Sequence, residues 1–330
     1  MVQFQSQQIY KGLGVHKTLT LGTNDGVCSL AISGLVSGNF LYAGLYTTPG
    51  KVVKINLQTL KIVATRMLAT GENKVSSLAV SRHFLYAGLN TTPGKVVKRD
   101  LNNFLGAYST LTLATSENKV SSLAVSGYFL YAGLNTTPGK VVKIDLNHFL
   151  GAYSTRMLAT GEDGVNALAV SGHFLYAGCC TDPSKVVQIN LNNFSGAYLT
   201  RTLDPGDQNL SALAIKGNDL YVGIWVTGPG KLIKIDLNNF LGAYSTLTLG
   251  TDESEVVSLA VLGNLLFVGA IWCDVLCIDL NNYTVVSTIT LPSADSAVAL
   301  TVGGDYLYAG CFMIPGKVFM IGPGPGTIMR

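Results

Sequence analysis

Residues 75–113 read VSSLAVSRHFLYAGLNTTPGKVVKRDLNNFLGAYSTLTL, and this stretch decides the fold. Short runs of β-branched and aromatic residues alternate with turns that contain Asn, Gly and Pro. The runs predict four strands, at 75–81, 84–89, 96–101 and 108–113, and no window has helical periodicity of useful length. Four short strands joined by tight turns predict one antiparallel sheet.

The same unit recurs along the whole chain. Seven copies of Leu-Tyr-Ala-Gly, or of a close variant, begin at Leu41, Leu85, Leu130, Leu175, Leu220, Leu266 and Leu307. A period of roughly 45 residues is typical of one four-stranded blade of a β-propeller. The innermost predicted strand also keeps a leucine at one column, between small and branched residues, in every copy: Leu30, Leu78, Leu123, Leu168, Leu213, Leu259 and Leu300. The sequence therefore predicts an all-β, seven-bladed β-propeller of four-stranded antiparallel blades.

The two ends of the chain carry complementary parts of one blade. The last copy has only three predicted strands, and Gly322-Pro-Gly-Pro-Gly326 is not expected to continue a sheet ladder. Segment 15–21 ends in Thr-Leu-Thr-Leu, a sequence that also stands at the fourth strand of two other blades. We therefore predict that 15–21 is the outer strand of blade seven and covers its edge. The predicted organisation is an N-terminal extension (1–14), one propeller domain (15–321) and a Gly/Pro tail (322–330).

This layout resembles the YVTN-type β-propeller repeats of the WD40/YVTN-like superfamily. Leu-Tyr-Ala-Gly stands where that family has its YV-type strand, and VVKIDLNHF at 141–149 stands where it has its VSVID-type strand and turn. The resemblance covers about residues 15–321 and concerns blade design, since the Gly-His and Trp-Asp pairs of WD40 repeats are missing. It implies a fold and no particular reaction.

Composition narrows the classes of partner. Charged residues make up 12% of the chain, the net charge is +3, and no basic run exists, which argues against nucleic acid and against a charged membrane surface. The uncharged segment 256–273 is interpreted as two strands rather than a membrane helix, because Gly263-Asn264 falls at a turn position. The N-terminus has no apolar signal region, which favours the cytoplasm but leaves the compartment open. A closed ring is expected to be a monomer.

Residue types that support catalysis or metal binding are sparse. The four histidines do not form a nucleophile–histidine–acid set on any spacing argument. The six cysteines lack CxxC spacing and are interpreted as buried free thiols. A soft-metal site of Cys273, Cys277 and Cys311 with Asp274 is the alternative. We expect no catalytic residue, no metal and no cofactor.

Two charged columns are expected at one end of the propeller, called here the upper face, where the second-to-third and fourth-to-first connections lie. The acidic column consists of Glu72, Glu117, Glu162, Asp207 and Glu253. The lysine column consists of Lys51, Lys95, Lys140, Lys185, Lys231 and Lys317. One interpretation is a charged ring that selects an ionic ligand. The favoured interpretation is alternating surface charges that pair between blades and contribute little individually.

The column that ends the second strand differs sharply among otherwise similar copies. It reads Tyr46, Asn90, Asn135, Cys180, Trp225, Ile271 and Phe312. Its apolar members belong to the contiguous blades five, six, seven and one, and blade six replaces the Pro-Gly-Lys turn with Trp-Cys-Asp. We call the set formed by Trp225, Ile271, Trp272, Asp274, Phe312 and Tyr46 the upper-face arc. It is interpreted as an aromatic-lined recess for a ligand. The alternative is that these side chains fill the space left by the short loop of blade six.

Three function classes follow. The first is a non-enzymatic binding module that presents loops on a rigid disc to a protein, peptide or glycan. A multivalent version of it predicts contacts at Asn90 and Asn135. The second is a lyase or hydrolase with Asp207, Glu253 or Asp274 at the upper mouth. The third is a structural component of a larger assembly, which an extended exposed apolar patch would support.

Overall fold

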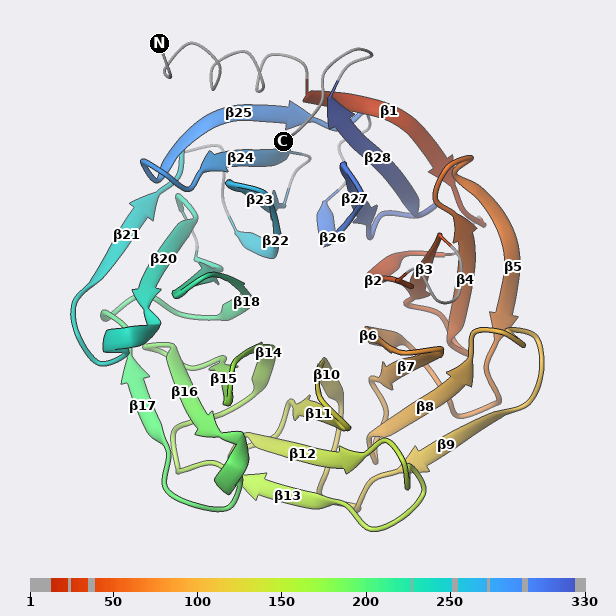
Figure 1. Cartoon of the computed structure of the whole chain (residues 1–330), viewed down its shortest axis with the longest axis horizontal. Helices are drawn as coiled ribbons and strands as arrows, with labels where there is room; N and C mark the ends of the chain where they lie inside the picture. The colour runs from red at the N-terminus through yellow and green to blue at the C-terminus, as the bar shows by residue number, and fades with distance from the viewer. Residues whose placement is uncertain are drawn as a thin grey trace.

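A computed structural model shows a ring of four-stranded antiparallel sheets around a central axis (Figure 1). It describes residues 13–22, 25–34, 39–226, 228–250, 255–271, 274–292 and 296–323. Seven such sheets occur within these ranges. The predicted all-β, seven-bladed propeller is therefore confirmed.

Blades one to six each run from the axis outward in chain order. Blade one consists of β2 (Val27–Ile32), β3 (Phe40–Leu45), β4 (Lys51–Asn56) and β5 (Lys61–Met67). Blade two consists of β6 (Val75–Ser81), β7 (Phe84–Leu89), β8 (Lys95–Asp100) and β9 (Tyr108–Thr112). Blade three consists of β10 (Val120–Ser126), β11 (Phe129–Leu134), β12 (Lys140–Asp145) and β13 (Ser154–Met157).

The remaining blades follow the same order. Blade four consists of β14 (Val165–Ser171), β15 (Phe174–Cys179), β16 (Lys185–Asn190) and β17 (Leu199–Thr202). Blade five consists of β18 (Leu210–Lys216), β19 (Asp219–Ile224), β20 (Lys231–Asp236) and β21 (Tyr244–Thr248). Blade six consists of β22 (Val256–Leu262), β23 (Leu265–Ala270), β24 (Asp274–Asp279) and β25 (Thr284–Thr290). Single 3-10 turns, η1 (Leu191–Asn193) and η2 (Leu237–Asn239), follow β16 and β20.

Blade seven joins the two ends of the chain. It contains β26 (Ala297–Gly303), β27 (Tyr306–Cys311), β28 (Lys317–Pro323) and, at its outer edge, the N-terminal β1 (Leu13–Thr20). The pairing of β1 with β28 runs from Thr20 opposite Lys317 to Leu13 opposite Pro323, so the predicted closure is confirmed. His16 forms a bulge in β1, and its Nε2 lies 3.0 Å from the carbonyl oxygen of Gly322.

The expectation that the ladder ends before Gly322 was wrong. Gly322 and Pro323 belong to β28 and face Gly14 and Leu13 of β1. The pairing of β28 with β27 ends at Ile321, so beyond that residue β28 has a neighbour on one side only. A strand with a single neighbour tolerates proline, because the missing N–H can face away from the ladder.

The core lies in the seams between blades. The second strand of every blade carries one buried aromatic residue at the same position. This residue is Phe267 in blade six and a tyrosine that is at most 2% exposed in the other blades: Tyr42, Tyr86, Tyr131, Tyr176, Tyr221 and Tyr308. In the seam between blades one and two, the Tyr42 ring packs 5.6 Å from the Phe104 ring, and the next three seams repeat this pair. The loops at the two ends of the blades are thus held on a rigid framework. In the described part of the chain, no helix has the length and apolar character needed to cross a membrane.

Candidate functional site

A cavity of about 340 Å³ opens at the upper end of the central axis. The second residue of the innermost strand contributes to its wall in six blades: Ser76, Ser121, Asn166, Ser211, Val257 and Val298. Six innermost strands can line one cavity only where they converge, which is at the axis (Figure 1). Strand alternation explains the choice of residue, because in β6 Val75 and Ser77 are buried in the seam while Ser76 points to the axis.

One half of this wall is polar. Blades two to five contribute polar residues, namely Ser76, Asn90, Ser121, Asn135, Asn166 and Ser211, together with Lys119. The hydroxyls also join neighbouring blades, since Ser76 Oγ donates to the carbonyl oxygens of Gly88 (3.0 Å) and Val120. Asn135 Nδ2 donates to Asn166 Oδ1 at 3.5 Å. The Asn90 amide makes no side-chain hydrogen bond to the described residues, so it is available to a ligand.

The other half is apolar. Trp225 lies at the edge of the cavity with 40% of its surface exposed, and Val257 and Val298 continue the apolar wall. Pockets that combine an apolar wall with a few placed polar groups are typical of ligand sites. Sequence reasoning missed the second residue of the innermost strand, whose change from Ser and Asn to Val in blades six and seven was visible in the alignment of the copies.

The structure brings together only part of the predicted upper-face arc. Trp225 lines the cavity, while Tyr46 and Phe312 form a separate edge-to-face pair with ring centroids 5.4 Å apart. Lys74 Nζ lies 4.5 Å above the Tyr46 ring and gives this pair a cation–π contact. Ile271 is half-buried beside the start of blade six.

The blade-six end of the arc is described only in part. Asp274 begins β24, and its Oδ1 is buried without a hydrogen-bond partner among the described residues. Trp272 lies outside the described residues. The arc is thus a cavity-lining tryptophan with a neighbouring aromatic pair, and its continuity through blade six stays a prediction.

The acidic column does not encircle the mouth as exposed charges. Its described members are buried: Glu72, Glu117, Glu162 and Asp207 are 7%, 5%, 4% and 1% exposed. Glu253 lies outside the described residues. Each buried glutamate sits in the connection between two blades and accepts hydrogen bonds from a threonine of the following outer strand and from a tyrosine at or just before the start of that strand. These carboxylates therefore act as structural acceptors within the seams.

The seam tyrosines and lysines complete this arrangement. Burial and the hydrogen bond to Glu117 raise the pKa of Tyr153, so the phenol stays a donor over a wide pH range. Ion pairs join Lys51 to Asp25 at 2.6 Å and Lys231 to Asp207. The Lys95 ammonium instead donates to the carbonyl oxygen of Gly71 at 3.0 Å, and Lys140 and Lys185 bind the equivalent connections. Lys231 and Asp207 thus pair between the two columns, whereas the partner of Lys51 is Asp25, which lies outside the acidic column.

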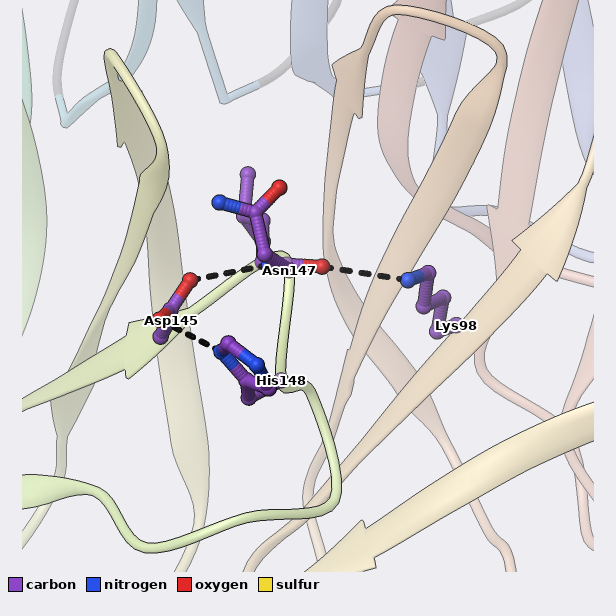
Figure 2. A network of polar contacts seen from close by, with 5 residues as sticks. Lys98, Asp145, Asn147 and His148 are labelled. Atoms are coloured by element: carbon purple, nitrogen blue, oxygen red, sulfur yellow. Dashed lines mark hydrogen bonds and ion pairs between the residues drawn. The ribbon is translucent and has the colours of Figure 1, made fainter.

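Larger grooves of about 410 and 360 Å³ lie at the opposite, lower rim, between blades two and three and between blades three and four. The two grooves have equivalent walls. In each, a lysine lies beside one phenylalanine of its own blade and one phenylalanine of the next blade. Figure 2 shows Lys98, which lines the first groove, beside a turn of blade three: Lys98 Nζ donates to the Leu146 carbonyl at 3.2 Å, and Asp145 accepts from the Asn147 N–H at 2.9 Å. His148 Nδ1 lies 3.1 Å from the same carboxylate. The grooves follow from the repeat, whereas the upper cavity differs from blade to blade.

Chemically reactive groups are unfavourably placed in the described residues. Burial raises the pKa of Cys28, Cys179 and Cys277 to about 12, so their thiols stay protonated at neutral pH. Within the described ranges, Cys28, Cys179, Cys180 and Cys277 form no disulfide, and no three His, Cys, Asp or Glu side chains cluster as a metal site would need. Cys273, part of the alternative soft-metal set, lies outside those ranges.

The fold and the cavity define a seven-bladed β-propeller with an asymmetric upper mouth. No family model matches the chain, and no curated protein matches its sequence. Among solved structures, the chain is similar to the computationally designed Ika8 protein. That similarity has a TM-score of 0.62 and 16% sequence identity, and covers 91% of this chain and 97% of the designed chain. At this identity the likeness shows the fold alone.

Proposed function

We propose that the protein is a non-enzymatic binding module that holds part of a protein, peptide or glycan at its upper mouth. The observation that carries this proposal is the cavity of about 340 Å³ with one polar and one apolar half. Its size falls within the roughly 300–1,000 Å³ of small-ligand pockets. The β-propeller fold commonly serves as an interaction scaffold, in agreement with this function.

The chemistry of the wall indicates how such a ligand binds. Trp225 offers a flat apolar surface to a ring or an aliphatic side chain. Across the cavity, Asn90 and Asn135 offer amides that both donate and accept hydrogen bonds. Lys119 is the charged residue among those that line the cavity. A neutral or singly anionic ligand is therefore favoured over a cation.

Four acids of the upper face, Glu72, Glu117, Glu162 and Asp207, do not favour the alternative of a lyase or hydrolase. A catalytic base needs a carboxylate that is free to take a proton. Glu72, Glu117 and Glu162 accept hydrogen bonds from side chains at both carboxylate oxygens, and Asp207 is paired with Lys231. No specific contact of these groups supports an enzymatic proposal.

Affinity capture from the source organism's extract, read by mass spectrometry, tests the proposal. Three proteins are compared: wild type, Trp225→Ala, and Tyr128→Ala, whose ring is 55% exposed in a turn at the opposite end of blade three. We expect wild type and Tyr128→Ala to retain the same partners and Trp225→Ala to lose them. Equal retention by all three proteins, or no enrichment over bare resin, would show that the mouth is not the binding site. Enzymatic deglycosylation of the extract separates a glycan ligand from a polypeptide one.

A further inference from the structure

Blade two carries an arginine at a column where every other blade has isoleucine. Arg99 is the fifth residue of β8 and pairs with Leu85 of β7. The equivalent residues are Ile55, Ile144, Ile189, Ile235, Ile278 and Ile321. A charge at a position built for an aliphatic side chain requires a compensating partner.

Arg99 is buried in the seam between blades one and two. Only 2% of its surface is exposed, and its guanidinium group lies 4.7 Å from the centroid of the Tyr108 ring. Its Nη1 donates to the carbonyl oxygens of Phe104 and Gly106, the latter at 3.1 Å. Its Nε and Nη2 are buried and have no hydrogen-bond partner within the part of the chain that the structure describes.

The seam between blades four and five shows how the same turn is used by one arginine. There Arg201, from the outer strand β17, donates through Nε to the Phe240 carbonyl at 2.6 Å and through Nη2 to the Gly242 carbonyl. Phe240 and Gly242 occupy the places of Phe104 and Gly106 in the repeat. One guanidinium group is therefore sufficient for these two acceptors.

In the seam between blades one and two, two guanidinium groups compete for that turn. Arg66 occupies the place of Arg201, but Arg99 takes the two carbonyls, so Arg66 Nη1 donates to the Leu105 carbonyl at 3.2 Å instead. Arg66 Nε is buried without a hydrogen-bond partner among the described residues. The seam thus holds a surplus of positive charge and three donor nitrogens that lack acceptors in the described part of the chain.

The nearest carboxylate does not neutralise this surplus. Glu72 interacts electrostatically with Arg99, but its oxygens accept hydrogen bonds from Thr110 Oγ1 (2.7 Å), the Tyr108 hydroxyl (2.7 Å) and the Ala69 N–H (3.0 Å). Burial and the charge of Arg66 lower the pKa of Arg99 to about 10, so the group stays protonated at neutral pH. Water would satisfy the free N–H groups but would leave the excess positive charge of the two guanidinium groups over Glu72 uncompensated.

The free edge of Arg99 defines the chemistry of a partner. Nε–H and one Nη2–H of a guanidinium group point in the same direction, and this fork matches two oxygens of a phosphate, sulfate or carboxylate. We infer that a small tetrahedral oxyanion of the phosphate or sulfate class binds between blades one and two, on the Arg99 fork, with Arg66 as the second cation. Arg66 lies on the outer strand β5 and is half-buried. This site is separate from the upper cavity and does not depend on the proposed function.

Thermal unfolding and calorimetric titration with sodium phosphate, sodium sulfate and sodium chloride at equal ionic strength test the inference. The key variant is Arg99→Ile, which restores the residue of the six other blades and is expected to fold. The matched control is Arg156→Leu. Like Arg66, Arg156 is an outer-strand arginine with a buried Nε that lacks a hydrogen-bond partner among the described residues, and blade two has leucine at the equivalent position. Sodium acetate distinguishes a planar carboxylate from a tetrahedral anion.

We expect phosphate or sulfate, but not chloride, to raise the melting temperature of the wild type in a saturable manner. Arg156→Leu should keep this response. Arg99→Ile should bind phosphate at least about tenfold more weakly, since it lacks the charged fork, and should melt higher than wild type in chloride alone. The inference is overturned if wild type responds equally to all three salts, if acetate alone is selected, or if Arg99→Ile responds like wild type.

Discussion

Replacing Glu117 with alanine tests whether buried carboxylates hold neighbouring blades together. Glu117 lies in the connection from blade two to blade three and is 5% exposed. Its carboxylate accepts hydrogen bonds from the Tyr153 hydroxyl (2.8 Å), Thr155 Oγ1 (2.6 Å) and the Ala114 N–H (3.1 Å). Alanine removes this acceptor from all three donors.

The expected loss follows from the number and exposure of these donors. A hydrogen bond to a charged group contributes about 1.5–3 kcal/mol. Thr155 and Ala114 are exposed, so water replaces part of their contribution, while the Tyr153 hydroxyl lies deeper in the seam. With each bond at the low end of this range and one of the three restored by water, the free energy of unfolding should fall by about 3 kcal/mol. Glu117→Gln keeps one carbonyl acceptor and should lose about half as much.

Urea unfolding followed by circular dichroism measures both variants. The midpoint should shift while the dependence on urea concentration stays that of the wild type, because the surface exposed on unfolding is unchanged. Asp305→Ala, in an exposed turn of blade seven, is the control and should change the free energy by less than about 0.5 kcal/mol. A loss below about 1 kcal/mol for Glu117→Ala would show that the carboxylate network contributes little beyond hydration.

Three further predictions concern the framework. Burial raises the pKa of Tyr86 to about 12 from the usual 10, so the native state holds this proton more tightly than the unfolded chain. Stability should be complete below pH 10 and fall as the pH rises toward 12, and Tyr86→Phe, which copies Phe267 of blade six, should make the decline in urea midpoint shallower. In Gly88→Ala the new methyl carbon would lie 2.5 Å from Val120 Cγ1, and chemical unfolding should show a loss of about 1–3 kcal/mol; an unchanged midpoint would contradict the packing of this seam. Deletion of residues 1–21 removes β1 and uncovers the edge of β28, so the protein should aggregate or melt at lower temperature, and an unchanged melting temperature would refute closure by β1.

The sequence was sufficient to predict the ring and its closure, because both follow from repeated columns. A blade buries the same tyrosine and aliphatic positions in each copy, so the repeat fixes the strands and their order. The matching Thr-Leu-Thr-Leu segments then identify β1 as a displaced fourth strand. The closing strands are longer than predicted, since β1 begins at Leu13 instead of Val15 and β28 continues to Pro323, where a single neighbouring strand accommodates the proline.

The placement of the charged columns could not be predicted from charge alone. Glu72 is buried because hydroxyl donors of Tyr108 and Thr110 meet it, and these lie 36 and 38 residues further along the chain. The same separations recur for Glu117 and Glu162, so a search for fixed spacing between acids and hydroxyl residues would have found the network. Likewise, the departure of Arg99 from its isoleucine column is visible in the sequence. Its consequence appears only when the competing Arg66 is placed in the same seam.

The closing strand pair also sets how the molecule responds to force. Leu13 of β1 faces Pro323 of β28, so the two ends of the paired segments lie side by side at one end of the sheet. A pull applied through the two termini therefore separates Leu13 from Pro323 first and then each following pair in turn, as in a zipper. Shearing, in which all pairs of the ladder resist together, would require the ends to leave from opposite ends of the sheet. The pairing of β1 with β28 closes the ring against heat and denaturant. Tension on the termini opens the ring at this same pairing, one residue pair at a time.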